Sequence, residues 1–126
     1  MKPPCQIYRK KLLGNGSFGK TFLISFETHA NEDYVLKQLY KPFISKDSLL
    51  KEYNFIKTIK NENYDKIYDL FENDDYYEII MEFCDTNLKE YFENKKFFTI
   101  TEIKHILFSL NNIFIYLFIY FLFIYL

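Results

Sequence analysis

The sequence contains no tryptophan, only three glycines and only two cysteines among its 126 residues. Cys5 and Cys84 are too few and too far apart for a disulfide framework or a zinc site, which favours a reducing, cytoplasmic location. Lysine and arginine number 16 against 17 acidic residues, so a formal charge of −1 gives no basis for nucleic-acid binding. The first residues contain no apolar segment typical of a secretory signal. The length suits one modest domain.

The three glycines, Gly14, Gly16 and Gly19, lie within six positions of the chain. Glycine adopts positive φ readily, and because it has no Cβ it lets a ligand approach the backbone closely. Their clustering therefore indicates a place where one or both of these properties are needed. The segment Gly14-Asn15-Gly16-Ser17-Phe18-Gly19 fits the pattern GxGxxG, which on its own is a weak signal of phosphate binding.

The pattern of apolar residues predicts an α+β fold with a five-stranded antiparallel sheet. β-rich runs flank the glycines, which places the glycines at a hairpin tip, and a polar turn at 29–33 precedes a third strand that contains Lys37. Asn73-Asp74-Asp75 separates the two strands of a second hairpin. The expected strands are 7–13, 20–26, 34–39, 66–72 and 76–83.

Helices are expected over 45–60, over 88–94 and from 99 onward. The first is amphipathic, with Ser45 or Asp47 as its N-cap and Glu52 on or beside its buried stripe. The spacing of Thr99 and Glu102 fits a capping box that opens the third helix. The expected architecture is thus a sheet with one helix against it, followed by the first helices of a second, incomplete lobe.

The surroundings of the glycines distinguish between the folds that bind phosphate with them. A Rossmann fingerprint follows a strand and opens a helix, whereas here the next helix comes only after a further strand. The letters of a Walker phosphate loop, GxxxxGK[ST], occur at Gly14 to Thr21, but that loop also opens a helix, whereas a strand is expected after this segment. For the glycines alone, an ordinary flexible hairpin is the simpler alternative.

The order of glycine loop, strand lysine and helix glutamate resembles the amino-terminal lobe of eukaryotic-type protein kinases. The resemblance covers residues 7–110, and it is carried by residues 13–19, by Thr21 and by Tyr34-Val35-Leu36-Lys37. It implies that the glycine loop and Lys37 hold the phosphates of ATP and that Glu52 holds the lysine. Two positions depart from the family pattern, with Thr21 in place of the usual valine and Val35 in place of the usual alanine.

The resemblance continues into Ile80-Met81-Glu82-Phe83-Cys84-Asp85, which is similar to the kinase hinge. It implies a gatekeeper at Met81, adenine hydrogen bonds from the backbones of Glu82 and Cys84, and a ribose contact at Asn87. A strand lysine or a helix glutamate taken singly is more often a solvated surface residue. The residues implied to bind ATP are Leu13, Gly14, Asn15, Gly16, Ser17, Phe18, Gly19, Thr21, Val35, Lys37, Glu52, Met81, Glu82, Cys84 and Asn87.

The 126 residues contain neither the HRD motif of a kinase catalytic loop nor the DFG motif whose aspartate holds magnesium. We therefore assign no catalytic residue and no metal ligand, although Mg²⁺ is expected with ATP in a full-length kinase. The implied function is ATP binding within a protein kinase, of serine/threonine type by the frequency of that class. Phosphoryl transfer to a protein substrate then needs the missing lobe. The alternative is an inactive nucleotide-binding pseudokinase or regulatory fragment.

Residues 111–126 are an apolar, low-complexity tail, in which positions 113–126 are only Ile, Phe, Tyr and Leu. A membrane anchor is one explanation, but 14 such residues are fewer than a spanning helix needs, which is about 20. A buried helix of a large lobe is another. AT-rich non-coding DNA encodes these residue types, so we favour read-through at a mispredicted gene boundary, with a membrane tether as the less favoured alternative.

Overall fold

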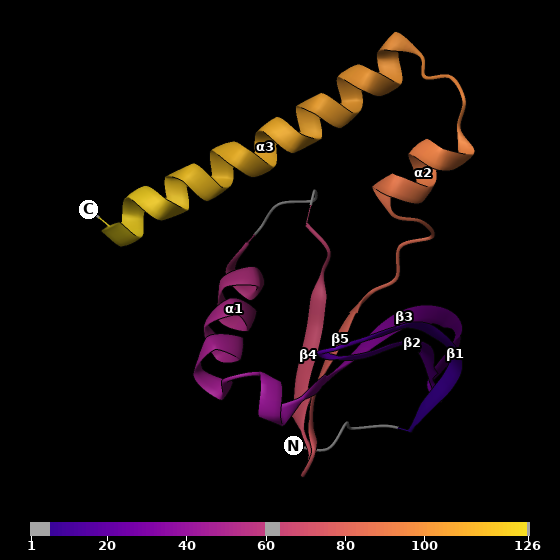
Figure 1. Ribbon diagram of the computed structural model, residues 1–126, viewed down its shortest axis with the longest axis vertical. Coiled ribbons are helices and arrows are strands. Elements are labelled where there is room, and N and C mark those ends of the chain that lie inside the picture. Colours follow the sequence, from indigo (N-terminus) through magenta and orange to yellow (C-terminus); the bar gives the residue numbers. More distant parts are fainter. Residues whose placement is uncertain (1–5, 60–63, 126) are drawn as a thin grey trace. The chain divides into compact units, whose positions relative to one another are not determined.

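The computed structural model describes residues 6–59 and 64–125 (Figure 1). The described chain divides into two units. The sheet unit, residues 6–59 and 65–83, contains five strands and the helix α1. The helical unit, residues 64 and 84–125, contains the helices α2 and α3. The expected α+β fold with a five-stranded antiparallel sheet is confirmed.

The strands of the sheet unit lie in the order β1-β2-β3-β5-β4, and each is antiparallel to its neighbour. Residues 29–33, predicted as a turn, instead begin β3. The reason is that Glu27 and Thr28 alone form the turn, and His29 already pairs with Phe26. The strands are β1 (Ile7–Gly16), β2 (Gly19–Phe26), β3 (His29–Tyr40), β4 (Ile67–Glu72) and β5 (Tyr76–Glu82).

Both faces of the sheet carry buried apolar side chains. Neighbouring residues of a strand point to opposite faces, so Ile79 and Ile80 of β5 belong to different clusters. Burial of each such side chain contributes roughly 1.5–3 kcal/mol, so the sheet is stabilised from both sides. One cluster is Ile24, Leu36, Phe71 and Ile80, and the other is Leu39, Leu49, Tyr77 and Ile79.

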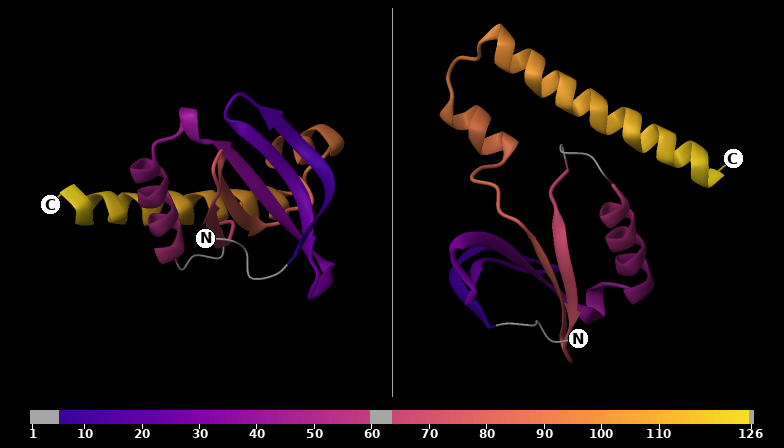
Figure 2. Two further views of the ribbon diagram at one scale, coloured as in Figure 1. Left: turned by 90° about the horizontal axis from the view of Figure 1, so that it is seen from below. Right: turned by 180° about the vertical axis from the view of Figure 1, so that it is seen from behind.

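The helix α1 (Lys46–Thr58) follows a short 3-10 helix, η1 (Lys41–Phe43), and lies beside β4 (Figures 1 and 2). Ser45 is its N-cap, as predicted, although the Ser45 side chain makes no capping hydrogen bond. Lys46 and Lys41 place their Nζ atoms 2.7 and 3.0 Å from the carboxylate of Glu72 at the end of β4. These cations, Lys46 first, lower the pKa of the Glu72 carboxyl. The start of α1 is thereby attached to the sheet.

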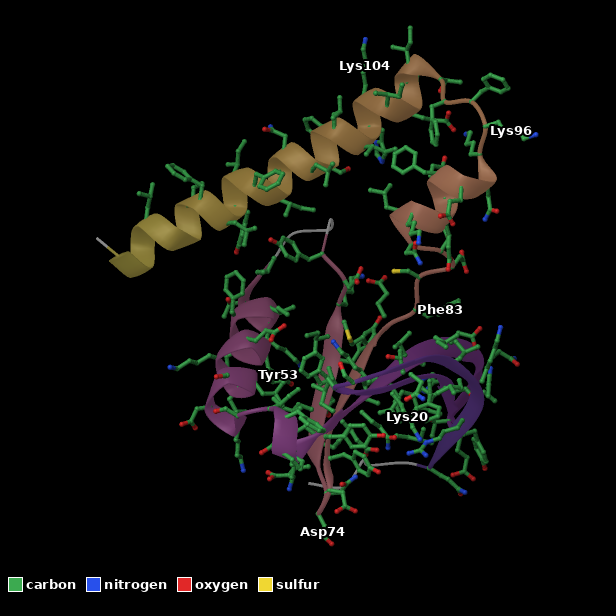
Figure 3. All side chains as sticks on the ribbon, viewed as in Figure 1. Lys20, Tyr53, Asp74, Phe83, Lys96 and Lys104 are labelled. Carbon is green, nitrogen blue, oxygen red and sulfur yellow. The ribbon has the colours of Figure 1, made fainter. Side chains whose placement is uncertain are left out.

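The predicted hairpin between β4 and β5 is confirmed, and Figure 3 shows Asp74 at its tip. The side-chain oxygen of Asn73 accepts the N–H groups of Asp75 at 3.1 Å and Tyr76 at 2.8 Å. Asparagine bonds its own backbone in this way readily, which is why it favours tight turns.

The helical unit contains α2 (Leu88–Asn94) and α3 (Ile100–Tyr125). The predicted capping box is confirmed, because the Glu102 N–H donates to Thr99 Oγ1 at 3.2 Å and the Thr99 N–H donates to Glu102 Oε2 at 2.9 Å. An ion pair between Lys95 and Glu102 joins the two helices. Lys95 and the donors of Thr99 lower the pKa of the Glu102 carboxyl to about 2.

The helix α3 continues without a break through the boundary expected between residues 110 and 111. Its segment Ile100–Ile119 is long and apolar enough to cross a membrane, by length and composition alone. Many of its large apolar side chains are exposed, among them Ile100, Leu107, Phe108, Phe114 and Phe118. Residues 111–125 of the tail therefore continue a helix, and no part of its segment Ile100–Ile119 is fully buried in the described chain.

Candidate functional site

A pocket of about 850 Å³ lies in the sheet unit, where residues 14–19, here called the glycine loop, face β3 and α1. Its volume falls in the range of small-molecule sites, about 300–1,000 Å³. Its lining includes one cation, Lys37, and one carboxylate, Glu52. The full lining is Gly14, Asn15, Gly16, Ser17, Phe18, Gly19, Thr21, Lys37, Gln38, Leu39, Phe43, Ile44, Ser45, Ser48, Leu49, Glu52 and Ile79.

Gly19 is the glycine that the fold itself requires. Its φ is +154°, a region that side-chain-bearing residues rarely adopt, and a Cβ there would lie 1.8 Å from the carbonyl oxygen of Gln38. The backbone of the glycine loop rests directly on β3 at this point. A hydrogen bond of 3.0 Å from the Tyr40 N–H to the Phe18 carbonyl holds the tip of the loop on the same strand.

Gly14 and Gly16 differ from Gly19, because a Cβ would have room at both. It would meet nothing within 4 Å at Gly14, and at Gly16 only the carbonyl of Gly19, at 4.0 Å. The fold therefore does not need glycine at these two positions. Their backbone borders open space in the pocket, where a ligand could approach the N–H groups.

Lys37 and Glu52, on β3 and α1, both line the pocket. The register of the sheet places Lys37 between Thr21 of β2 and Ile79 of β5, so these three residues share one face. Both Lys37 and Glu52 are exposed. Within the described residues, no ion pair joins them. The structure thus brings the predicted lysine and acid into one pocket without pairing them.

Four further predicted residues lie in the sheet unit outside the pocket lining. Val35 pairs with Met81 across β3 and β5, on the same face as Lys37 and one pleat further along. Glu82 is the last residue of β5, and its N–H donates to the Lys66 carbonyl at 2.8 Å. Leu13, the fourth such residue, is exposed on β1.

Cys84 and Asn87 belong to the helical unit and do not line the pocket. Asn87 is the N-cap of α2, and its side-chain oxygen accepts the Glu90 N–H at 2.9 Å. The predicted ribose contact would therefore use a side chain that already caps a helix.

The lining also contains residues that the sequence reasoning did not assign to the site. Two patterns could have found several of them. Ser45, Ser48 and Leu49 precede Glu52 by seven, four and three positions, which is the spacing of one helix face. Ile79 is the strand partner of Lys37. The remaining residues missed are Gln38, Leu39, Phe43 and Ile44.

This arrangement suits an anionic ligand with an apolar part. Open backbone at Gly14 and Gly16 offers N–H donors, and Lys37 supplies a positive charge on a rigid strand. Leu39, Leu49 and Ile79 supply apolar surface. A nucleotide, whose sugar carries both a phosphate ester and an aromatic base, has both of these properties.

The protein kinase domain family matches residues 7–123 of the chain. The chain belongs to the protein kinase family. The resemblance of its glycine loop, strand lysine and helix glutamate to the amino-terminal kinase lobe is thereby confirmed. The kinase match includes α3 almost to its end.

Two similar proteins are the calcium-dependent protein kinases 4 of Plasmodium falciparum (isolate 3D7) and Plasmodium berghei (strain Anka). Each is 35% identical to this kinase chain over 74 residues. The match covers 56% of this chain and 14% of either relative. The chain thus corresponds to a small part of these larger kinases.

Proposed function

We propose that this chain is the ATP-binding portion of a protein kinase. The observation that carries the proposal is that the glycine loop, Lys37 and Glu52 line one pocket of about 850 Å³. The loop backbone at Gly14 and Gly16 donates to the phosphates, and Lys37 neutralises part of their charge. Glu52 is the acid that holds Lys37 when nucleotide is bound.

The adenine end of this site lies along the same face of the sheet. Val35 and Met81, which pair across β3 and β5, form its apolar wall, and Thr21 borders the loop side. Leu13 is assigned to the same side by the family resemblance. The backbones of Glu82 and Cys84 hydrogen-bond adenine, and Asn87 contacts the ribose. The roles of Val35 and Met81 rest on the family resemblance together with the sheet face that they share with Lys37. Those of Glu82, Cys84 and Asn87 rest on the family resemblance alone.

Phosphoryl transfer from ATP to a protein, on serine or threonine, is proposed for the kinase that includes the missing lobe. The 126 residues contain no HRD or DFG motif, so they supply neither the catalytic base nor the ligands of Mg²⁺. Nucleotide binding is therefore the step that we assign to the residues described.

Calorimetric titration of the 126-residue chain with ATP tests this proposal, in mild detergent that keeps α3 in solution. We expect saturable binding, and Lys37→Met is expected to weaken it about tenfold to a hundredfold, because a charge-assisted contact is lost. Lys51→Met is the matched control, since Lys51 is exposed on α1 and does not line the pocket. Folded protein that binds no ATP, or that binds equally well without Lys37, would contradict the proposal.

A nucleotide-binding fragment that acts without catalysis is the second candidate, favoured by the lack of HRD and DFG motifs. Incubation of the chain with radiolabelled ATP and a generic protein substrate distinguishes the two. We expect no label transfer by these 126 residues, and transfer by a gene product that includes a second lobe. A gene product with that lobe that binds ATP but transfers nothing would support the second candidate.

The proposed location is the cytoplasm, on the cysteine content and the kinase family. The exposed apolar helix α3 makes a membrane tether the specific alternative. Fractionation of cells that express the tagged chain distinguishes them, since a tethered chain stays with the membranes at high salt and at alkaline pH.

A further inference from the structure

A polar link between side chains crosses the sheet on the face opposite the side chains of Lys37 and Ile79. Gln38 is 7% exposed, and its Nε2 donates to Glu78 Oε1 at 2.5 Å. The same Glu78 oxygen lies 3.5 Å from Nη2 of Arg9. Because Gln38 and Glu78 are register partners on β3 and β5, the link joins β1, β3 and β5.

The Arg9–Glu78 contact joins strands that are not neighbours in the sheet. β2 and β3 separate β1 from β5 in the strand order (Figure 1). The guanidinium of Arg9 crosses this distance over Phe22 of β2, with its carbon 4.7 Å from the ring centre. The side chain thus reaches across the curved sheet and is held by a cation–π contact as well as a charge.

Glu78 needs this partner. Its side chain is only 14% exposed, and a largely buried carboxylate is costly unless it is paired and hydrogen-bonded. Gln38 supplies a neutral donor, and Arg9 supplies the cation. Removing Arg9 would leave a charge among apolar neighbours, and the strands around Glu78 would shift to admit water.

The strand that would shift also supports the glycine loop. Gly19 packs against the backbone of Gln38 so closely that no Cβ fits, and the Tyr40 N–H holds the carbonyl of Phe18. Lys37 lies beside Gln38 on this strand. β1 itself is an edge strand with two register irregularities, between Arg9 and Lys11 and between Leu12 and Gly14, so its ladder holds it only loosely.

We propose that Arg9 and Glu78, which act on β3 through the hydrogen bond between Glu78 and Gln38, are positioning residues that hold the glycine loop over the pocket and thereby increase its affinity for nucleotide. Neither residue lines the pocket. The effect on affinity rests on the proposed ATP binding, whereas the effect on the loop does not depend on it.

The first measurement needs no nucleotide. The sequence has no tryptophan, so Phe18→Trp places a single indole, which can be excited apart from the tyrosines, at the tip of the loop. In this background we expect Arg9→Ala to make the indole more accessible to acrylamide, by about twofold or more in the quenching constant. Lys11→Ala, which removes an exposed cation two residues along β1, is the matched control and should change nothing.

The second measurement is calorimetric titration with ATP in the native Phe18 background. We expect Arg9→Ala to raise Kd about threefold to tenfold, which lies in the lower part of the range for coupled neighbours. Arg9→Lys, which keeps the cation, should retain most of the affinity. In the Glu78→Gln background, Arg9→Ala should have little further effect, because the buried charge is already gone.

The outcomes separate the two proposals. Absence of ATP binding by the native chain would overturn the proposed function, while the quenching experiment still decides the positioning role. Unchanged quenching and unchanged Kd in folded Arg9→Ala protein would overturn the positioning role. If Arg9→Ala does not fold, Arg9→Lys and Glu78→Gln replace it. An Arg9→Lys protein whose indole has the same acrylamide quenching constant as that of Glu78→Gln would count against a role for the cation.

Discussion

The sheet unit and the helical unit bury their apolar residues to opposite degrees. Ile80 in β5 is 1% exposed, whereas Phe108 in the more apolar helix α3 is 65% exposed. The difference lies in what surrounds each element. A strand of a sheet has neighbours on both edges and side chains packed on both faces, but a single helix has no partner until another element covers it. Apolar composition therefore does not by itself predict burial in this chain.

The two units also differ in where their stabilising contacts lie. In the sheet unit, two apolar clusters, the ladders and a buried polar link act on the same strands. In the described helical unit, the contacts concentrate at the corner between α2 and α3, where Lys95 pairs with Glu102 near the rings of Tyr91, Phe92 and Phe98. The sheet unit should unfold cooperatively, and the helical unit should open locally.

The largest expected effect comes from matched truncations in the two units. Ile80→Ala should destabilise the sheet unit by about 2–5 kcal/mol, because it leaves a cavity among buried neighbours. Phe108→Ala should change the stability by less than about 0.5 kcal/mol, as exposed substitutions do. Hydrogen exchange of the β3 and β5 amides measures the first cost, and exchange of the α3 amides measures the second. Equal destabilisation by the two substitutions would contradict the conclusion that apolar side chains stabilise the sheet unit more than the helical unit.

The second prediction concerns the glycines within the sheet unit. Gly19→Ala should cost about 1–3 kcal/mol from backbone strain, and more if β2 and β3 must separate to clear the Gln38 carbonyl. Gly14→Ala should leave the stability of the unit nearly unchanged, since its Cβ meets open space. Thermal unfolding followed by β-sheet circular dichroism tests both. The helical signal of α3 should stay the same in either variant, which would show that the units are independent.

The third prediction is a pH dependence confined to the helical unit. The pKa of Glu102 is lowered from about 4.5 to about 2 by Lys95 and by the donors of Thr99. A carboxyl with a depressed folded-state pKa stabilises fully above about 4.5, and the stabilisation is lost as the pH falls towards 2. The first turn of α3 should therefore open between these values.

Amide exchange of residues 99–103, followed by NMR between pH 6 and pH 2, measures this opening. Glu102→Gln is the control, because it retains an acceptor for the cap but does not titrate, and its exchange should not show the transition. Constant protection of the native first turn down to pH 2 would contradict the prediction.

The smallest expected effect lies on the surface of α2. Lys89 and Glu93 form an exposed pair at 3.8 Å, four residues apart, with the lysine first, which is the weaker orientation. Lys89→Ala should change stability by no more than about 0.3 kcal/mol. Circular dichroism at low and high salt measures this change as helix content. A larger loss of helix content that depends on salt would contradict the prediction that this ion pair contributes little.

The sequence alone predicted what depends on local pattern. Residue spacing predicted four features: the glycine hairpin, the Asn73 turn, the face of α1 that carries Glu52, and the capping box of Thr99 and Glu102. The start of β3 was not, because residues 29–33 are polar and their strand state depends on pairing with β2. Tertiary pairing overrode a turn-like composition.

The less predictable parts of the site depend on contacts between distant residues. Arg9 and Glu78 are 69 positions apart and meet only because the sheet curves. The resemblance to kinases implied that Glu52 holds Lys37, and the two do line one pocket, but within the described residues no ion pair joins them. Such pairings follow from the three-dimensional path of the chain, which local patterns do not encode.

The unequal roles of the three glycines give a way to read the history of related sequences. Gly19 is required by the packing of backbone on backbone, so selection for a folded sheet retains it in any descendant. Gly14 and Gly16 are required only for what enters the open space beside them. In a lineage that ceases to bind nucleotide, Gly14 and Gly16 should be replaced by other residues while Gly19 persists. Sequences that keep only Gly19 would therefore identify lineages that have lost nucleotide binding.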